Sequence, residues 1–397
     1  MTPRFTSLFS GCGGLDIGFI KAGYSCVAAF DFDKDAVSSY KTNVGDHITQ
    51  LDLSLTQPAV LHAVSTSDVL VAGPPCQGFS TAGKQDPDDA RSSLLLKVAE
   101  IAGISKPPAV IIENVRGLLS PRSKSYWDRL DKSLRESGYR ISSRIVEATE
   151  FGVAQSRRRV IVLAVLNEHP IEMSFTSLPR VTLKDALRGI ENETHHSCNI
   201  LSKDSNSLKI AKKILPGQKL SNVRGGNASV HTWDIPEVFG LTTELERTVL
   251  KMMLSARRKH RRRNYGDADP VSESVLEAEL GKSVAAPLKS LIEKGFVKKV
   301  GAFYDLTNAF NGKFRRLKWD QPAPTVDTRF GQPRYFLHPD EDRGFSVREA
   351  ARIQGFPDAY KFPSSDSIAF RLIGNAVPPP MATAIASFAM NNLPRRT

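Results

Sequence analysis

The chain of 397 residues contains only four cysteines, at Cys12, Cys26, Cys76 and Cys198. Four cysteines are too few for a disulfide scaffold, and no two of them form a Cys-x-x-Cys pair. The sequence therefore predicts neither a disulfide framework nor a cysteine zinc knuckle, and no metal site is expected.

Long apolar runs are also missing. Runs such as residues 160–166 are far shorter than the roughly 20 residues that a membrane span requires. The first residues lead straight into a glycine-rich turn without the apolar core of a signal peptide. Hydrophobic residues at 41% and charged residues at 24% exclude wholesale disorder. We therefore expect a soluble protein in a reducing cytoplasm, with no membrane partner.

Acidic residues are fewer than basic ones. The chain has 42 Asp and Glu and 54 Lys and Arg, which gives a net charge of +12. Such an excess favours a polyanionic partner, most simply nucleic acid. A chain of 397 residues is longer than a typical single domain, so its length predicts two or three domains.

The first 170 residues alternate short apolar runs with amphipathic segments. This alternation predicts an α/β domain built on a doubly wound, mostly parallel sheet. Expected strands are residues 4–9, 25–30, 68–72, 109–112 and 160–165. Expected helices are residues 15–22, 35–43, 92–104 and 126–137.

From about residue 175 the pattern changes. Residues 191–235 are polar and rich in Gly, Asn and Ser, and they predict no regular structure. A capping box at Thr243–Glu246 then opens a helix. Further helices at 274–280 and 283–294 precede a hairpin at 296–306, an order that resembles a winged helix-turn-helix module.

Four strand ends carry polar chemistry, and in open α/β sheets ligands bind outside the carboxyl ends of the strands. The first is the glycine loop at 9–14. Asp31 lies 20 residues beyond Gly11, a spacing that suits a carboxylate accepting hydrogen bonds from ribose hydroxyls. Asp16 replaces the third glycine of the dinucleotide fingerprint, which disfavours a pyrophosphate and leaves room for S-adenosylmethionine. A purely structural turn is the alternative.

The second strand end is the loop at 73–80, where two prolines stiffen the backbone before Cys76. A thiolate in a loop at the ligand edge is a natural nucleophile, whereas the other three cysteines are expected to be small core residues. The third is Glu113, whose partial desolvation would let it donate a proton near neutral pH. A helix cap or a surface carboxylate is the alternative for Glu113.

The fourth is the basic segment at 155–159. On an extended segment, Gln155, Arg157 and Arg159 share one face, which could contact a phosphate or a base edge. A solvated basic edge is the alternative.

These motifs, in this order, resemble those of the cytosine-5 DNA methyltransferases. The matching blocks are FTSLFSGCGGLDIGF (5–19), GPPCQGFS (73–80), ENV (113–115), QSRRR (155–159), VREAARIQGFPD (347–358) and GNAVPPP (374–380). They span residues 1–170 and about 310–397.

The resemblance implies methyl transfer from S-adenosylmethionine to a cytosine that is flipped out of duplex DNA. Cys76 would attack carbon 6, and Glu113 would stabilise protonation at nitrogen 3. Arg159 would contact the cytosine carbonyl, with Gln155 and Arg157 as neighbours. Cofactor contacts are implied at Phe9, Gly11, Cys12, Gly13, Gly14, Leu15, Asp31, Asp52, Pro75, Leu94, Asn375 and Val377. Asp31 departs from the Glu that is common at its position and is one methylene shorter.

The resemblance also implies a discontinuous catalytic domain. It places the S-adenosylmethionine domain at 1–173, target recognition at 174–338, and a hinge with a return to the catalytic domain at 339–397. The winged-helix-like stretch at 240–307 is not a standard part of the family, so its role in target recognition is our own inference.

Several residues are expected to contact DNA. The basic run should bind phosphates through Arg257, Arg258, Lys259, Arg261, Arg262 and Arg263. Ser80 is a further expected contact, and the third helix with Lys289 is the candidate for reading the groove. The loop at 216–235 competes for that role, and a winged helix used only for packing or protein contacts is another alternative.

The partners implied are duplex DNA and, in a bacterial restriction–modification system, a separately acting cognate restriction endonuclease, with the enzyme acting as a monomer. Rival hypotheses are a nicotinamide-dependent oxidoreductase, a DNA-binding protein on an inactive methyltransferase scaffold, and an RNA cytosine methyltransferase. The missing third glycine argues against the first, and Cys76, Glu113 and Arg159 argue against the second.

Overall fold

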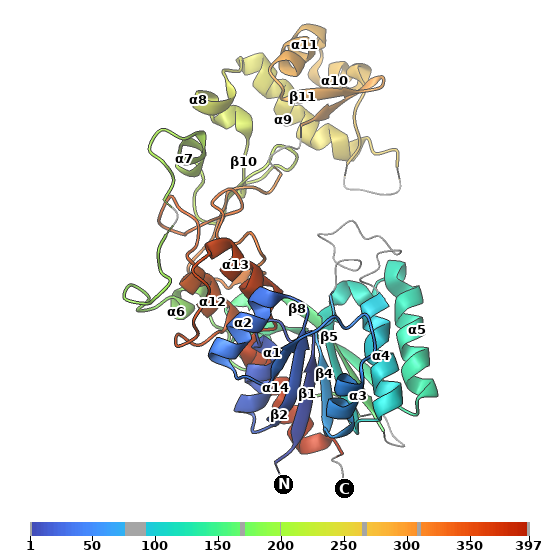
Figure 1. Ribbon diagram of the computed structural model, residues 1–397. Coiled ribbons are helices and arrows are strands. Elements are labelled where there is room, and N and C mark those ends of the chain that lie inside the picture. Colours follow the sequence, from blue (N-terminus) through green and yellow to red (C-terminus); the bar gives the residue numbers. More distant parts are fainter. Residues whose placement is uncertain are drawn as a thin grey trace. The chain divides into compact units, whose positions relative to one another are not determined.

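The computed structural model describes residues 2–75, 93–166, 171–198, 200–263, 268–307 and 311–394 (Figure 1). The chain divides into two compact units. Unit 1 combines Met1–His196, Trp319–Arg329 and Val347–Thr397, and unit 2 combines Ser197–Lys318 and Phe330–Ser346. Unit 1 is thus assembled from three separate stretches of the chain.

Unit 1 is built on a seven-stranded sheet with the order β3-β2-β1-β4-β5-β8-β6. The strands are β1 (Arg4–Leu8), β2 (Ser25–Asp31), β3 (Ile48–Gln50), β4 (Val69–Ala72), β5 (Ala109–Val115), β6 (Arg140–Glu147) and β8 (Arg158–Val165). The first five strands are parallel, and β8 runs antiparallel to both β5 and β6. The expectation of a mostly parallel α/β sheet is confirmed.

Helices cover both faces of this sheet (Figure 1). They are α1 (Gly14–Lys21), α2 (Lys34–Asn43), α3 (Pro58–Ser65), α4 (Ser93–Ser105), α5 (Lys124–Glu136) and α14 (Pro379–Asn392). Successive strand residues point to opposite faces, so Val69 and Val71 pack in the core with α1 and α14. Leu70 and Ala72 pack with α3, α4 and α5 on the other face.

Two glycines allow α1 and α14 to approach closely. A Cβ atom added at Gly18 would lie 2.4 Å from the Cβ of Ala382, and one at Gly14 would lie 2.3 Å from the carbonyl oxygen of Val377. Only glycine fits these positions, so α1 and the return segment are joined backbone to backbone beside the sheet.

Residues 174–196 lie in unit 1, whereas the predicted target-recognition domain began at residue 174. Phe175 packs against the rings of Phe151 and Phe388 at 5.5 and 5.6 Å. The short helix α6 (Leu183–Ala186) also stays in this unit, where the backbone N–H of Leu183 donates to the carbonyl of Gln321. These contacts hold the start of the predicted target-recognition domain in unit 1, which continues to His196.

The remaining elements of unit 1 come from the C-terminal part of the chain and the basic segment. β7 (Gln155–Ser156) pairs in parallel with β14 (Ala323–Pro324). The helices α12 (Val347–Gln354) and α13 (Asp366–Asn375) precede α14.

Unit 2 contains three helices followed by a hairpin, as predicted for 240–307. They are α9 (Glu244–Lys259), α10 (Glu273–Leu280), α11 (Ala285–Glu293), β11 (Val297–Val300) and β12 (Phe303–Leu306). The capping box at the start of α9 is confirmed, with reciprocal hydrogen bonds between Thr243 and Glu246. These elements share one core around the buried Trp233.

The rest of unit 2 is made of short elements. They are α7 (Asn206–Ala211), β9 (Lys219–Leu220), β10 (Ser229–Val230), α8 (Pro236–Phe239), β13 (Arg315–Arg316) and β15 (Phe336–Leu337). Among the helices of the described residues, none has the length and apolar character needed to cross a membrane.

Candidate active site

The carboxyl ends of four strands meet at one edge of the sheet. Leu8 pairs with Phe30 and with Ala72, and Ala72 pairs with Ile112. The antiparallel strand β8 begins at this same edge, because Arg159 pairs with Val115. The glycine loop, Asp31, the loop after β4, Glu113 and Arg159 are therefore assembled around one edge, which we call the catalytic edge.

The glycine loop leaves β1 through left-handed backbone conformations. Phe9 has φ 57°, Gly11 has φ 57° and Gly13, the N-cap of α1, has φ 90°. The loop is held by the N–H of Gly11, which donates to Oδ2 of Asp31 at 2.8 Å. This arrangement places the N-terminal N–H groups of α1 at the catalytic edge, and such groups attract an anionic ligand group.

Asp31, the predicted ribose ligand, ends β2. Oδ2 accepts from Gly11, and Oδ1 accepts from the N–H of Asp33 at 2.8 Å. Burial raises its pKa, and the hydrogen bonds from the backbone oppose that rise. Each carboxylate oxygen has a second lone pair, so Asp31 can bind the backbone of the glycine loop and still accept a hydrogen bond from a hydroxyl group.

Phe32 was missed in the sequence analysis. Its side chain is 71% exposed directly after Asp31. A large exposed aromatic at the end of a core strand offers a flat surface for stacking. The available signal was an aromatic residue between two aspartates at a strand end.

The other expected cofactor positions divide by their burial. Cys12 is 2% exposed, and burial raises its pKa to about 12, in agreement with a core cysteine. Val377 is also buried, and its carbonyl oxygen lies against Gly14. Leu15 is buried at the start of α1.

The remaining expected cofactor positions are more accessible to solvent. Pro75 and Leu94 are half-buried, and Asp52 and Asn375 are exposed. The N–H of Ser54 donates to Asp52 and lowers the pKa of that carboxyl.

Glu113 and Arg159 form an ion pair at the catalytic edge. Nε of Arg159 lies 2.9 Å from Oε1 of Glu113, and their side chains are only 13% and 11% exposed. No described residue donates a hydrogen bond to that Oε1 atom. The pair therefore presents a buried carboxylate oxygen beside a guanidinium, able to accept a further hydrogen-bond donor.

The adjacent Asn114 fixes the loop that leads to Cys76. Its Nδ2 donates to the carbonyl oxygen of Pro74 at 3.2 Å, and Asn114 is 1% exposed. Cys76 and Ser80 themselves lie outside the described residues. The structure thus describes the strand and the two prolines that precede the expected nucleophile.

Gln155 and Arg157 share a face with Arg159, as predicted, but their polar groups bind the protein itself. Gln155 is fully buried, accepts from the N–H of Val326 at 3.0 Å and donates to Gln354. Arg157 is 2% exposed and donates to three carbonyl oxygens, those of Val326, Gly374 and Ala376. Arg157 thus holds residue 326 and the end of α13, and Gln155 holds residue 326 and the end of α12. Both positions differ from the expected place beside the substrate.

Three of the six basic residues of the run, Arg257, Lys259 and Arg263, form ion pairs within unit 2. The buried Arg257 pairs with Asp305, and Arg263 pairs with the buried Asp269. The expected place of Arg257 on an open phosphate-binding surface is therefore wrong, because its buried guanidinium pairs with Asp305 of β12.

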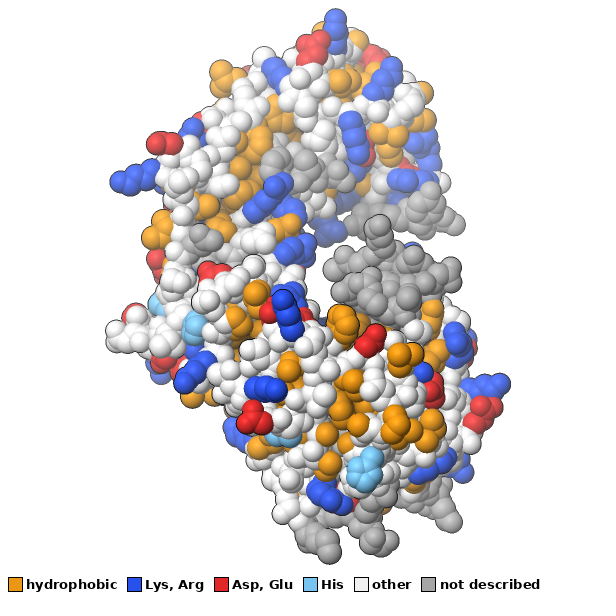
Figure 2. All heavy atoms as spheres, viewed as in Figure 1, with side chains coloured by type: hydrophobic (Ala, Val, Ile, Leu, Met, Phe, Trp, Pro, Cys, Tyr) orange, Lys and Arg blue, Asp and Glu red, His pale blue; other side chains and the backbone are white. Residues whose placement is uncertain are grey.

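The other members of the run stay at the surface. Lys259 pairs with Glu279 at 3.0 Å, and the guanidinium of Arg262 lies 3.6 Å from the centre of the Phe303 ring. Arg258, Arg261 and Lys289 are exposed. Figure 2 shows Lys and Arg side chains on the visible surface of unit 2.

The competing loop carries its own positive charge. Residues 224–228 are exposed between β9 and β10. The pKa of Lys219 is lowered by burial and by the nearby charges of Arg315 and Arg224. The positive charges of Arg315 and Arg224 therefore act on Lys219 of β9, the strand that precedes this loop.

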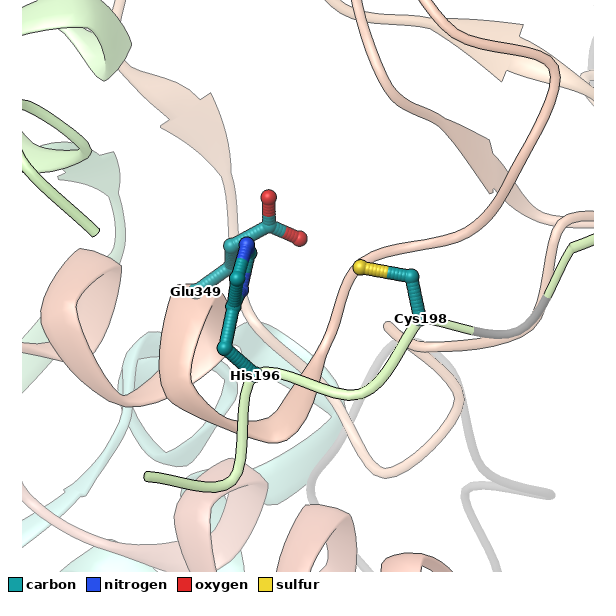
Figure 3. Close-up of side chains that lie close together, drawn as sticks. All are labelled: His196, Cys198 and Glu349. Atoms are coloured by element: carbon teal, nitrogen blue, oxygen red, sulfur yellow. The ribbon is translucent and has the colours of Figure 1, made fainter. Parts of the chain in front are cut away.

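Two possible metal ligands of unit 1 lie close together. Ligand atoms of His196 and Glu349 are within 4.8 Å of each other (Figure 3). Cys198, also drawn there, belongs to unit 2. Two ligands are fewer than the four of a structural zinc site, so this pair carries no metal assignment.

Comparison with known protein families gives one match along almost the whole chain. A family model described as C-5 cytosine-specific DNA methylase matches residues 3–390. The type II methyltransferase M.AgeI of Thalassovita gelatinovora is 31% identical, covering 96% of this chain and 97% of that protein. The type II methyltransferase M.HgiBI of Herpetosiphon aurantiacus is 28% identical, covering 96% and 95%.

Solved structures agree in fold. The Entamoeba histolytica methyltransferase EhMeth superposes with a TM-score of 0.56 at 14% identity, covering 98% of both chains. The S. pombe Dnmt2 methyltransferase gives a TM-score of 0.52 at 17% identity, covering 98% of both chains. At these identities the likeness concerns the fold alone.

Proposed function

The chain belongs to the C-5 cytosine-specific DNA methylase family, and we propose that it methylates carbon 5 of a flipped-out cytosine in a specific duplex DNA sequence through a covalent Cys76 adduct. The observation that carries the proposal is the Glu113–Arg159 ion pair at the catalytic edge, next to Asn114 and the loop that precedes Cys76.

The residues at the catalytic edge fit S-adenosylmethionine. The N-terminal N–H groups of α1 suit its carboxylate, the Asp31 carboxylate suits the ribose hydroxyls, and the exposed Phe32 ring suits the adenine. Asp16 is fully buried and bonded to Ser7 and Tyr40, so its place in the fingerprint serves the core and not a pyrophosphate. When bound, S-adenosylmethionine supplies a methyl group that carbon 5 can attack.

The side chains of the site then have distinct tasks. The Cys76 thiolate forms a bond to carbon 6 of the cytosine, and Glu113 holds a proton at nitrogen 3 so that the ring accepts the added electron pair. Arg159 donates to the cytosine carbonyl oxygen and orients Glu113 through their ion pair. When carbon 5 takes the methyl group, the bond from the sulfonium sulfur to that methyl breaks and S-adenosylhomocysteine is the leaving group. A base then removes the proton from carbon 5, the double bond between carbons 5 and 6 re-forms, and the Cys76 thiolate leaves.

Sequence recognition is assigned to unit 2. In this proposal, the three helices and the hairpin act as a winged-helix-like module, and the exposed Lys289 of α11 reads the groove. The order of these elements and the exposure of Lys289 support this assignment. In this proposal, the exposed Arg258 and Arg261 bind phosphates. The positive charge beside residues 224–228 supports phosphate contact there as well.

The relatives named type II methyltransferases support a restriction–modification setting. We infer that the enzyme acts as a monomer in the bacterial cytoplasm and protects host DNA from a separate restriction endonuclease. An RNA cytosine substrate remains the second hypothesis because it would use the same chemistry.

Transfer of labelled methyl groups from S-adenosylmethionine separates these hypotheses. The wild-type chain should label mixed-sequence duplex DNA and leave tRNA unlabelled, and the Cys76→Ala variant should label neither. Labelling of tRNA alone would replace DNA by RNA as substrate. Labelling of DNA by Cys76→Ala at the wild-type rate would exclude the covalent mechanism.

A further inference from the structure

A tyrosine from the C-terminal part of the chain contacts the backbone of the glycine loop. Tyr360 follows α12 and is only 3% exposed. Its ring packs against Phe356 and Phe362 at 4.8 and 4.7 Å. The buried Arg348 donates to the carbonyl oxygen of Tyr360 at 2.9 Å. Packing on both sides and this hydrogen bond fix the position of the phenol.

The phenol makes two hydrogen bonds whose directions follow from chemistry. Its Oη lies 2.6 Å from the carbonyl oxygen of Cys12 and 2.9 Å from Oγ of Ser39 on α2. A carbonyl oxygen can only accept, so Tyr360 donates its single proton to Cys12. Ser39 must therefore donate to Tyr360, and the phenol links α2 to the glycine loop.

The peptide group that accepts this hydrogen bond lies in a glycine-rich segment, where ordering the backbone costs the most conformational entropy. Cys12 stands between Gly11 and Gly13, both with positive φ, and glycine loses more conformational freedom than any other residue when it is ordered. The N–H of the Cys12–Gly13 peptide donates to the carbonyl of Ser10 at 3.0 Å. Tyr360 holds the carbonyl end, so the peptide plane directly before α1 is fixed at both ends.

We propose that Tyr360 is a positioning residue for the cofactor: its hydrogen bond to Cys12 holds the glycine loop in the form that receives S-adenosylmethionine. This inference rests on the proposed function, because it assigns the loop to that cofactor. Without the hydrogen bond, the loop samples other conformations, and part of the binding free energy is spent on ordering it.

The chain offers a matched control. Tyr139 is fully buried in unit 1, and its Oη donates to the carbonyl oxygen of Pro107 at 2.8 Å. Pro107 lies just before β5 and Tyr139 just before β6, so this hydrogen bond is not part of the glycine loop. Tyr360→Phe and Tyr139→Phe each remove one hydroxyl that is bonded to a backbone carbonyl.

The experiment measures binding of S-adenosylmethionine and S-adenosylhomocysteine to the full-length chain by titration calorimetry, together with steady-state kinetics. Tyr360→Phe should weaken binding by roughly three- to tenfold, the range that one hydrogen bond supports. It should raise the KM for the cofactor more than it lowers kcat. Tyr360→Phe and Tyr139→Phe should lower the free energy of unfolding by similar amounts. Tyr139→Phe should leave the cofactor Kd at the wild-type value.

Other outcomes overturn the inference. A Tyr360→Phe variant with wild-type affinity, or an equal loss in both variants, would show that the hydroxyl only stabilises the fold. If Tyr360→Phe does not fold, Tyr360→Met, which fills the same buried position without a hydroxyl, serves instead, and its wild-type affinity would contradict the proposal. A wild-type chain that binds neither compound would instead refute the proposed function, which the variants cannot do.

Discussion

Nε of Arg159 and Oε1 of Glu113 lie 2.9 Å apart, on strands that run in opposite directions. The antiparallel pairing of β8 with β5 brings the start of one strand beside the end of the other. A basic side chain thereby reaches an edge that otherwise collects the carboxyl ends of strands. The pair couples the orientation of the expected proton-holding carboxyl to a neighbouring cation.

Replacement of Glu113 by Gln should separate chemistry from cofactor binding. The amide cannot hold a proton at cytosine nitrogen 3 as the carboxyl does, so kcat should fall by about 10²- to 10⁴-fold. The Kd for S-adenosylmethionine should not change. The control is Glu147→Gln, which removes the partner of the exposed Arg158 at 2.8 Å and should leave kcat unchanged. A Glu113→Gln enzyme with wild-type kcat would remove Glu113 from the mechanism.

Arg157→Ala should destabilise unit 1. The guanidinium is buried and donates to three backbone carbonyls, so its loss should lower the free energy of unfolding by roughly 3 kcal/mol. Arg158→Ala, one residue along and 61% exposed, should cost at most about 1 kcal/mol. Urea unfolding of both variants tests this difference. Equal losses would mean that the carbonyl contacts of Arg157 contribute little.

Asp16 should give the stability a measurable pH dependence. Burial raises its pKa to about 6 in the folded state, against hydrogen bonds from Tyr40 and Ser7 that lower it. The folded state therefore binds the proton more tightly, and this contribution is complete below about pH 4 and is lost as pH rises through 6.

The test compares wild type with Asp16→Asn, which cannot titrate. The difference in unfolding free energy, wild type minus variant, should fall between pH 4 and pH 7, by an amount on the order of 3 kcal/mol. A difference that is constant across this range would contradict the raised pKa of Asp16.

The basic run should contain two functional classes of residue. The double variant Arg258→Ala, Arg261→Ala should weaken DNA binding and reduce the slope of log Kd against log salt by roughly 2, without changing the preferred sequence. Arg257→Ala should instead lower stability, because its charge pairs with Asp305 in the core. An unchanged salt slope in the double variant would place the phosphate contacts elsewhere, for example beside residues 224–228.

Most strands of the seven-stranded sheet could be predicted from the sequence. Buried parallel strands such as 69–72 are unbroken apolar runs, which is the pattern by which such strands are recognised. β6 was missed because it lies at the edge of the sheet and alternates buried and exposed residues, with Arg, Ser and Glu among them. Its pattern resembles a surface segment when the neighbouring strand is unknown.

Within the site, the predictable residues were those set by strand ends, namely Asp31, Glu113 and Arg159. The internal roles of Gln155 and Arg157 depend on residues 326, 354 and 374–376, which lie far away along the chain. Periodicity gives the face of a side chain but not the partner that meets it. The hydrogen bond from Tyr360 to Cys12 was hidden for the same reason.

Bisulfite sequencing of duplex DNA treated with the enzyme and S-adenosylmethionine tests the central claim most directly. The account predicts methylated cytosines confined to one recognised sequence with the wild-type chain, and none with Cys76→Ala. A folded wild-type chain that binds S-adenosylmethionine and leaves every cytosine unmethylated would contradict it.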